Sequence, residues 1–468
     1  MKPLGIAVLA IGLFAGALGA SRSAGVVDSP SRAAVLGSSL PVEAPAPSAT
    51  PRVWRAPRAV PITPVLVQYE ALDPAFEPLA GARAVYGTYE GGAYQIEVPD
   101  NWNGSVVYFA HGFRGNPPAL VVSQPVLRRH FIERGFAWVA SSYSRNGYEP
   151  GVGARDTLAL RPIVEQRVGI PQRSYLYGES MGGNVVTYLL EHDPLVYDGA
   201  VTECGVVAGP EVLDYFLSWA VLGQYLTGVD FIDAGSSAAD RDSIIATRVL
   251  PALGTVDEPT ATGSAFFNAI EQLTGGPRPF FDEGLAANLV GNFMIIAHAV
   301  DLAGPSGAAA QNIDTLYTIA PAFPVTADRL NGGIERFAPA PAYANATAYP
   351  EFQPMTGRIE RPLLTLHGTG DLLVPIALEQ SYRRTVGAAG RGDLLVQRAV
   401  RRAGHCNFSL EERTHAFDDL VAWVEHDLRP AGEDLSGSLR NAGLLFTSPL
   451  EPSDPGAVIT VLDEPALP

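Results

Sequence analysis

The sequence predicts an α/β fold, in which helices cover both faces of a mostly parallel sheet and a helical segment is inserted between two parts of that sheet. Over most of the chain, short apolar runs alternate with stretches of helical periodicity. This alternation is typical of parallel strands joined by crossover helices. Between residues 209 and 355 it stops, and apolar helical segments follow one another. We therefore expect a core formed by 65–208 and 356–430, with 209–355 as an inserted helical cap.

Two strands that open the core differ in their expected burial. The alternation of polar and apolar residues in Ala93–Pro99 predicts a strand buried on one face. The unbroken apolar run Ser105–Ala110 predicts a strand buried on both faces. The other expected strands are 136–141, 174–177, 199–202, 361–368 and 393–400. The expected helices are 124–135, 156–168, 182–192, 212–225, 285–302 and 416–428.

The composition narrows the class of function. The chain has 468 residues, of which 47% are hydrophobic and 17% charged, as in globular proteins. Its net charge of -17 argues against nucleic acid or anionic lipid as a partner, because both require a basic face. The only lysine is Lys2. Mechanisms that need a lysine, such as Schiff-base, Ser-Lys and P-loop chemistry, therefore lack it.

The two ends of the chain lie outside the predicted core. Residues 1–20 combine a basic start, a short apolar run and small residues. They predict a cleaved signal peptide, because the run is shorter than the ~20 residues of a membrane span. The Pro- and Ala-rich stretch 21–64 predicts a linker or arm. In the tail 431–468 we expect 444–447 and 458–461 to pair at a sheet edge. The protein is expected to be secreted or periplasmic, without stable membrane insertion.

The segment Gly178-Glu179-Ser180-Met181-Gly182 has the pattern G-x-S-x-G. A serine nucleophile in this pattern sits on a tight turn between a strand and a helix, where glycines let the backbone fold closely and leave the hydroxyl exposed. The predicted strand 174–177 and helix 182–192 supply that context. Ser180 is therefore the expected nucleophile.

The loop after the buried strand 105–110 fits the same chemistry. It begins His111-Gly112 and continues with Phe113 and Arg114. Backbone N–H groups of such a loop and of the residue after the nucleophile form an oxyanion hole. We assign Phe113 and Met181 to this role, with Arg114 as the alternative to Phe113. His111 is interpreted as a histidine that shapes the loop, because a general base must reach the nucleophile.

A serine hydroxyl needs an imidazole to accept its proton and a carboxylate to orient that imidazole. Where the nucleophile lies on a strand-to-helix turn, the chain order is Ser, acid, His. Asp371 follows the predicted strand 361–368 and is the expected acid. Glu203, also at the end of a strand, is the competing carboxylate.

The expected base is His405, in the loop between the last predicted strand and the last helix. His415 and His426 are the other late histidines, and both fall within the helical pattern near the C-terminus. The remaining chain offers no histidine or cysteine spacing of a metal site and no dinucleotide-binding motif, so we expect no metal and no cofactor.

The two cysteines, Cys204 and Cys406, are expected to form a disulfide. Export would place them in an oxidising compartment, where a pair of cysteines tends to be joined. Cys204 follows the strand next to the one that carries the serine turn, and Cys406 follows the proposed base. Both belong at the same edge of the sheet. The alternative is a pair of buried free thiols.

In these motifs and their order, the chain resembles the α/β-hydrolase superfamily, in its secreted serine esterase and lipase branches. It is also similar to bacterial hydrolases that carry Pro-Asp-Asn-Trp-Asn-Gly before the first His-Gly, here 99–104, and Gly-His-Cys near the end, here 404–406. Tannase-like and feruloyl-esterase-like relatives place a cysteine directly before the nucleophile. This chain departs from them there, with Glu179.

The expected function is hydrolysis of a carboxylic ester, small or polymeric, through an acyl-enzyme on Ser180. A prolyl-type serine peptidase on the same core is the first alternative, although a peptide amine would need a carboxylate anchor that the sequence does not locate. The second alternative is a non-catalytic binding protein that kept the fold. It is disfavoured because no member of the expected triad is missing.

Overall fold

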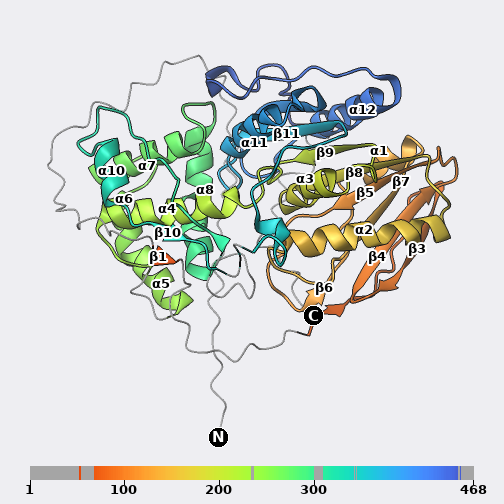
Figure 1. Ribbon diagram of the computed structural model, residues 1–468, viewed down its shortest axis with the longest axis horizontal. Coiled ribbons are helices and arrows are strands. Elements are labelled where there is room, and N and C mark those ends of the chain that lie inside the picture. Colours follow the sequence, from red (N-terminus) through yellow and green to blue (C-terminus); the bar gives the residue numbers. More distant parts are fainter. Residues whose placement is uncertain are drawn as a thin grey trace, which may run out of the picture. The chain divides into compact units, whose positions relative to one another are not determined.

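A computed structural model describes residues 52–53, 68–232, 237–299, 309–341, 343, 345–451 and 454 (Figure 1). Its central element is an eight-stranded sheet in the order β12-β11-β9-β8-β5-β7-β4-β3. The strands are β3 (Ala82–Tyr89), β4 (Gly92–Pro99), β5 (Ser105–Ala110), β7 (Ala137–Ser141), β8 (Arg173–Glu179), β9 (Gly199–Glu203), β11 (Leu363–Gly370) and β12 (Leu395–Ala403). The neighbours from β7 to β12 pair in parallel, whereas β4 is antiparallel to both β3 and β7. The predicted α/β fold with a mostly parallel sheet is confirmed.

Helices cover both faces of the sheet. The helices of the core are α1 (Arg128–Glu133), α2 (Pro150–Arg167), α3 (Met181–His192), α11 (Ala377–Ala388) and α12 (Leu410–His426). Successive side chains of a strand point to opposite faces. In β5, Val106 and Tyr108 pack with residues of α2, α3 and α11, whereas Val107 and Phe109 pack with residues of α1 and α12. The strand is therefore buried on both sides, as its unbroken apolar run predicts.

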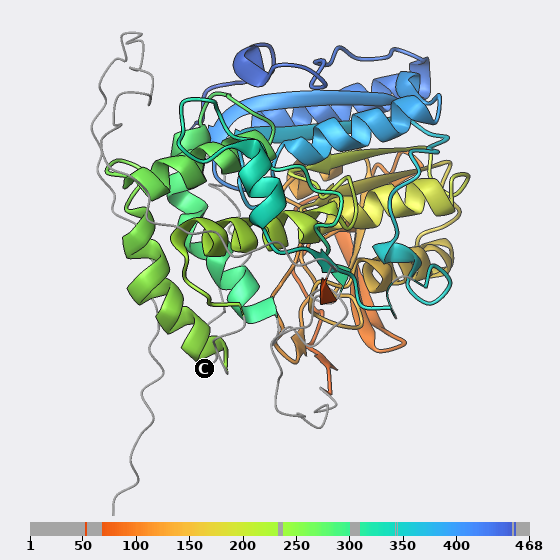
Figure 2. The same ribbon diagram turned by 60° about the vertical axis from the view of Figure 1, so that its left-hand side comes forward.

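Residues 209–355 are mainly helical in their described part and have an apolar core of their own. The elements are α4 (Glu211–Thr227), α5 (Ala238–Ile244), the π-helical turn η2 (Ile245–Val249), α6 (Leu250–Leu253), α7 (Ala261–Leu273), α8 (Phe281–Ala299), α10 (Ala327–Gly333), β10 (Phe337–Ala338) and η3 (Pro350–Phe352). Trp219 packs edge-on against Phe266 and Phe293, whose rings stack on each other. Figure 2 shows the green helices of this segment gathered together. The insertion is thus a packed helical unit.

Two short strand pairs lie outside the main sheet. β1 (Arg52–Val53) runs parallel to β10, so the predicted arm 21–64 contacts the insertion at this point. β2 (Glu70–Ala71) runs parallel to β6 (Ala119–Leu120). The predicted signal segment 1–20, most of 21–64 and the expected edge strand 458–461 lie outside the described residues. In the part of the chain that is described, no helix is both long and apolar enough to span a membrane.

The prediction that Ala93–Pro99 is buried on only one face is wrong, because the whole of β4 is buried. Its polar positions lie inside the protein and are paired. Glu97 accepts hydrogen bonds from Arg128 at 2.6 and 2.7 Å and from the indole N–H of Trp138 at 2.8 Å. The alternating pattern shows which side chains of a strand are polar but not whether they contact water. In β4 the polar side chains form their hydrogen bonds within the protein.

The expected strand at 444–447 is also wrong, because these residues form a turn. Gly443 has a φ of 79° and donates to Glu433, and the Thr447 hydroxyl donates to the Gly443 carbonyl at 2.5 Å. These bonds bend the chain back on itself, which an extended strand does not allow. The apolar run Leu444-Leu-Phe therefore has a composition typical of a strand but does not adopt an extended backbone conformation.

Candidate active site

The serine turn is formed by a close approach of three backbone segments. Ser180 lies between β8 and α3 with φ 54° and ψ -119°, a conformation that non-glycine residues rarely adopt. A Cβ atom on Gly182 would lie 1.9 Å from the Ala110 carbonyl oxygen, and one on Gly178 would lie 2.4 Å from the Gly182 carbonyl oxygen. Only glycine fits at these two positions, which is the physical reason for the G-x-S-x-G pattern.

Ser180, Asp371 and His405 meet at the carboxyl edge of the sheet, on the loops that follow β8, β11 and β12. His405 Nε2 lies 2.8 Å from Ser180 Oγ, and His405 Nδ1 lies 2.7 Å from Asp371 Oδ2. The carboxylate Oδ1 accepts backbone hydrogen bonds from Leu373 at 2.9 Å and Val374 at 3.0 Å. These partners favour the tautomer in which Nδ1 carries the proton and Nε2 accepts one. A serine turn at this edge, followed in the chain by an acid and then a histidine, is the arrangement that distinguishes the α/β-hydrolase fold from other parallel-sheet folds.

The chain has the α/β-hydrolase fold. In this α/β-hydrolase core the competing carboxylate Glu203 is engaged elsewhere, because its carboxylate accepts a hydrogen bond from Arg413. The other late histidines, His415 and His426, both lie within α12. Of the alternatives considered for acid and base, the structure brings only Asp371 and His405 into hydrogen-bond contact with each other.

The loop after β5 lies against Ser180. A Cβ atom on Gly112 would lie 3.0 Å from Ser180 Cβ, so Phe113 directly follows the point of closest approach. The backbone N–H of Met181 lies at the N-terminus of α3. Among the described residues, no acceptor is found for the N–H groups of Phe113 and Met181. Both N–H groups therefore have hydrogen-bonding capacity to spare on the Ser180 side of this loop and turn.

His111 fixes this loop. Its Nδ1 lies 2.7 Å from the Gly112 carbonyl, its ring stacks on Tyr143 at 3.9 Å, and the Tyr143 hydroxyl donates to the His111 carbonyl at 3.2 Å. Burial lowers the pKa of His111 to about 3, so the ring is neutral at physiological pH. A buried neutral ring with these neighbours matches the loop-shaping role expected from the sequence.

The insertion contacts the loop that carries Asp371. The Tyr215 hydroxyl and the Asn292 amide both donate to the Leu372 carbonyl, at 2.6 and 2.8 Å. Arg278 Nε donates to the Thr369 carbonyl at 2.7 Å. Arg278 is not recognisable in the sequence, because an arginine before a short Pro-Phe-Phe run carries no motif. Its place near Asp371 follows only from the packing of the insertion on the end of β11.

Comparisons with known proteins find distant similarities to hydrolases. No protein-family model matches the chain. It is 21% identical over 402 residues to an o-phthalyl amidase of Xanthobacter agilis, covering 74% of this chain and 87% of that protein. It is similar to an esterase from Aspergillus oryzae, at 14% identity and a TM-score of 0.41, covering 75% and 80% of the two chains. It is also similar to feruloyl esterase B from the same organism, at 11% identity and a TM-score of 0.44, covering 73% and 80%.

Cys204 and Cys406 form a disulfide, with their Cα atoms 5.1 Å apart and a sequence separation of 202. Cys204 follows β9 and Cys406 directly follows His405, so the bond ties the histidine loop to the strand beside the serine turn. His405, Cys204 and Cys406 also form a cluster whose possible metal-ligand atoms lie within 4.8 Å of one another. The sulfurs are bonded to each other and both ring nitrogens are engaged, so these atoms are not free to bind a metal.

Reduction of this disulfide should lower activity before it unfolds the protein. The bond restrains the loop that holds His405, whereas the core is packed without it, so we expect kcat to fall about tenfold. Ester hydrolysis and intrinsic tryptophan fluorescence, followed together through a titration with reductant, measure the two effects. A Cys204→Ala, Cys406→Ala double variant is the control for side effects of the reductant. Loss of activity and fluorescence in a single step would contradict the prediction.

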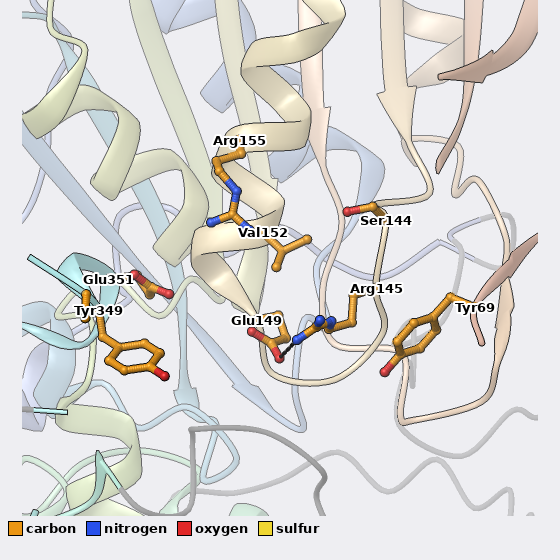
Figure 3. Close-up of a pocket in the computed structure, with 9 residues that line it drawn as sticks. Tyr69, Ser144, Arg145, Glu149, Val152, Arg155, Tyr349 and Glu351 are labelled. Atoms are coloured by element: carbon orange, nitrogen blue, oxygen red, sulfur yellow. Dashed lines mark hydrogen bonds and ion pairs between the residues drawn. The ribbon is translucent and has the colours of Figure 1, made fainter. Parts of the chain in front are cut away.

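A pocket of about 350 Å³ lies at the same edge of the sheet, beside the loop after β7 (Figure 3). Its lining residues are Tyr69, Ser144, Arg145, Glu149, Val152, Arg155, Ala348, Tyr349 and Glu351. The loop after β7 is bonded to the loop after β5, since Gly147 N donates to the Gly115 carbonyl at 2.9 Å. In the sheet, β5 lies between β7, whose loop lines the pocket, and β8, which carries the serine turn. Ser180 is not among the residues that line this pocket.

Proposed function

We propose that this protein is a serine hydrolase that cleaves carboxylic esters through an acyl-enzyme on Ser180. The observation that carries the proposal is the continuous set of hydrogen bonds from Asp371 through His405 to Ser180, at 2.7 and 2.8 Å. The similarity to esterases and to an amidase supports the same class of chemistry. Phe113 and Met181 are the proposed oxyanion donors.

The proposed mechanism follows from the roles of these atoms. Ser180 Oγ attacks the ester carbonyl while His405 Nε2 accepts its proton, and Asp371 stabilises the imidazolium that forms. The N–H groups of Phe113 and Met181 bind the oxyanion. The tetrahedral intermediate then expels the alcohol, which takes the proton from His405. Water, activated by the same imidazole, hydrolyses the acyl-enzyme and restores Ser180.

The insertion is proposed to act as a cap that selects substrates. Its support is the set of hydrogen bonds that Tyr215, Asn292 and Arg278 make to the backbone around Asp371. Export through the 1–20 segment also remains part of the proposal. It is supported by the disulfide, since such bonds persist in oxidising compartments.

An amide hydrolase is the second candidate, favoured by the similarity to an o-phthalyl amidase. Amides and esters use the same triad, but an amide nitrogen is the poorer leaving group and needs protonation by His405 as it departs. The test compares an ester and an anilide that share one acyl group, p-nitrophenyl butyrate and butyryl-p-nitroanilide. A higher rate on the ester is expected of both classes, so the anilide decides: we expect no hydrolysis of the anilide above that of Ser180→Ala. Hydrolysis of the anilide by the wild type that is lost in Ser180→Ala would assign the protein to amide hydrolysis.

The non-catalytic alternative is tested with a fluorophosphonate probe. An activated serine reacts with the probe, and we expect mass spectrometry to find the adduct on Ser180. Folded protein that remains unlabelled, with no turnover of either substrate, would favour a binding protein and contradict the proposed function.

A further inference from the structure

Arg413 is a fully buried arginine of α12 that contacts both sides of the active site. Its guanidinium donates a hydrogen bond to the Glu203 carboxylate, and its Nη1 lies 3.9 Å from Glu179 Oε1. From the same side chain, Nη2 donates to the Cys406 carbonyl at 2.8 Å and Nε to the Phe408 carbonyl at 3.4 Å. One planar group thus contacts two carboxylates and two carbonyls.

The two carboxylates lie at the ends of the strands that hold the nucleophile and the disulfide. Glu179 and Glu203 are paired in the parallel register of β8 and β9. Glu179 directly precedes Ser180, and Ser180 N donates to the Glu203 carbonyl at 3.1 Å. A group fixed to both glutamates is therefore fixed to the base of the serine turn.

The two carbonyls belong to the loop of the proposed base. Cys406 directly follows His405, and Phe408 lies two residues further on, with its ring 5.4 Å from the Arg413 guanidinium carbon. An arginine fork can hold several acceptors in one plane, whereas a lysine presents a single point charge. The geometry therefore suits a connection between this loop and the two strand ends.

We propose that Arg413 is a positioning residue, which holds the His405 loop against the strand ends at Glu179 and Glu203 and so fixes the distance from His405 Nε2 to Ser180 Oγ. This inference rests on the proposed hydrolase function. Arg413 acts beside the disulfide and not through it. The disulfide joins Sγ atoms of Cys204 and Cys406, whereas Arg413 binds the Cys406 carbonyl and the Glu203 carboxylate. The loop is thus restrained twice.

The electrostatics agree with this geometry. Burial raises the pKa of Glu179, and the Arg413 guanidinium is the strongest influence that opposes the rise. Burial also raises the pKa of Glu203 well above its usual range. Carboxyl groups as buried as these are costly when charged and unpaired, so removing the guanidinium leaves groups that must find other partners. The disulfide to Cys204 is then the one of these two restraints that still holds the loop to the strand ends.

The test uses the full chain with Arg413→Met, which keeps much of the side-chain volume and removes all donors, and with Arg413→Lys. We expect Arg413→Met to lower kcat on p-nitrophenyl butyrate about ten- to a hundredfold, with KM within about twofold. The kcat of Arg413→Lys should lie between the kcat of Arg413→Met and that of the wild type. The rate of labelling by the fluorophosphonate should fall with kcat, because both depend on His405 activating Ser180.

Reduction of the disulfide in Arg413→Met provides the second measurement. If the two restraints act on one loop, the loss in kcat with both removed should exceed the product of the separate losses. If the loss in kcat with both restraints removed equals the product of the two separate losses, the proposal that Arg413 and the disulfide restrain the same loop is overturned.

Arg398→Met is the matched control. Arg398 is also a buried arginine of this half of the sheet, but it pairs with Asp419 at 2.5 Å and donates to the Ala431 carbonyl at 3.0 Å, away from the histidine loop. The Arg398→Met variant should have lower thermal stability than the wild type and an unchanged kcat.

If Arg413→Met does not fold, the double variant Glu203→Gln, Arg413→Met is used instead, because it removes the carboxylate that Arg413→Met leaves unpaired. A normal kcat and labelling rate in folded Arg413→Met, or a loss confined to KM, would overturn the inference. Failure of the wild type to label would instead contradict the proposed function.

Discussion

Replacing Ser180 with alanine should lower kcat on p-nitrophenyl esters by at least about a thousandfold, since loss of the nucleophile in a serine triad leaves only binding and the oxyanion hole. Alanine removes Oγ alone. The turn is held by Gly178, Gly182 and the hydrogen bond from Ser180 N to the Glu203 carbonyl, all of which remain. Initial rates of ester hydrolysis, together with the thermal melting temperature, measure the effect separately from folding.

The control for this variant is Ser436→Ala, which removes an exposed hydroxyl whose partner is Asp434. It should keep full activity and full labelling by the fluorophosphonate. Activity of Ser180→Ala within about tenfold of the wild type, still blocked by the probe, would place the nucleophile elsewhere and would remove the basis of the proposed mechanism.

The serine turn could be predicted from sequence because its physical constraints are local. Gly178 and Gly182 are required by contacts within a few residues of Ser180 or with the adjacent strand β5, and the chain order of Asp371 and His405 follows from the topology of the sheet. The pairing of Cys204 with Cys406 could be anticipated for the same reason, because strand ends at one edge of a parallel sheet lie close together.

Features that depend on packing between distant segments were not predictable. Glu97 looked like the solvent side of a strand, and only its bonds to Arg128 and Trp138 explain its burial. Arg278 and Arg413 carry no sequence motif, and each reaches the site from a helix or turn packed on the sheet edge.

The predicted start of α12 at residue 416 is wrong, because the helix begins at Leu410, directly after the capping box of Ser409 and Glu412. This local signal was present in the sequence. It could have placed the helix directly after the His405 loop, and with it Arg413 one turn into that helix.

The second large effect is expected for Asp371→Asn, which should lower kcat on p-nitrophenyl esters about 10⁴-fold, the size of the loss for this change in a serine triad. The reason lies in the hydrogen bonds of the carboxylate. Its Oδ1 accepts the backbone N–H groups of Leu373 and Val374, so an asparagine must keep its oxygen there and turn its NH₂ toward His405 Nδ1. The imidazole must then carry its proton on Nε2, where it cannot accept the proton of Ser180.

Measurement of kcat, KM and the fluorophosphonate labelling rate for Asp371→Asn tests this argument, with Glu203→Gln as the comparison. Glu203 contacts Arg413 and has no hydrogen bond to His405 in the described residues, so its variant should lose far less kcat than Asp371→Asn. The alternative assignment of the acid makes the opposite prediction. If Asp371→Asn kept kcat within about threefold while Glu203→Gln lost the larger factor, the carboxylate that orients His405 during catalysis would be Glu203. The backbone bonds that fix Oδ1 of Asp371 would then serve only to shape its loop.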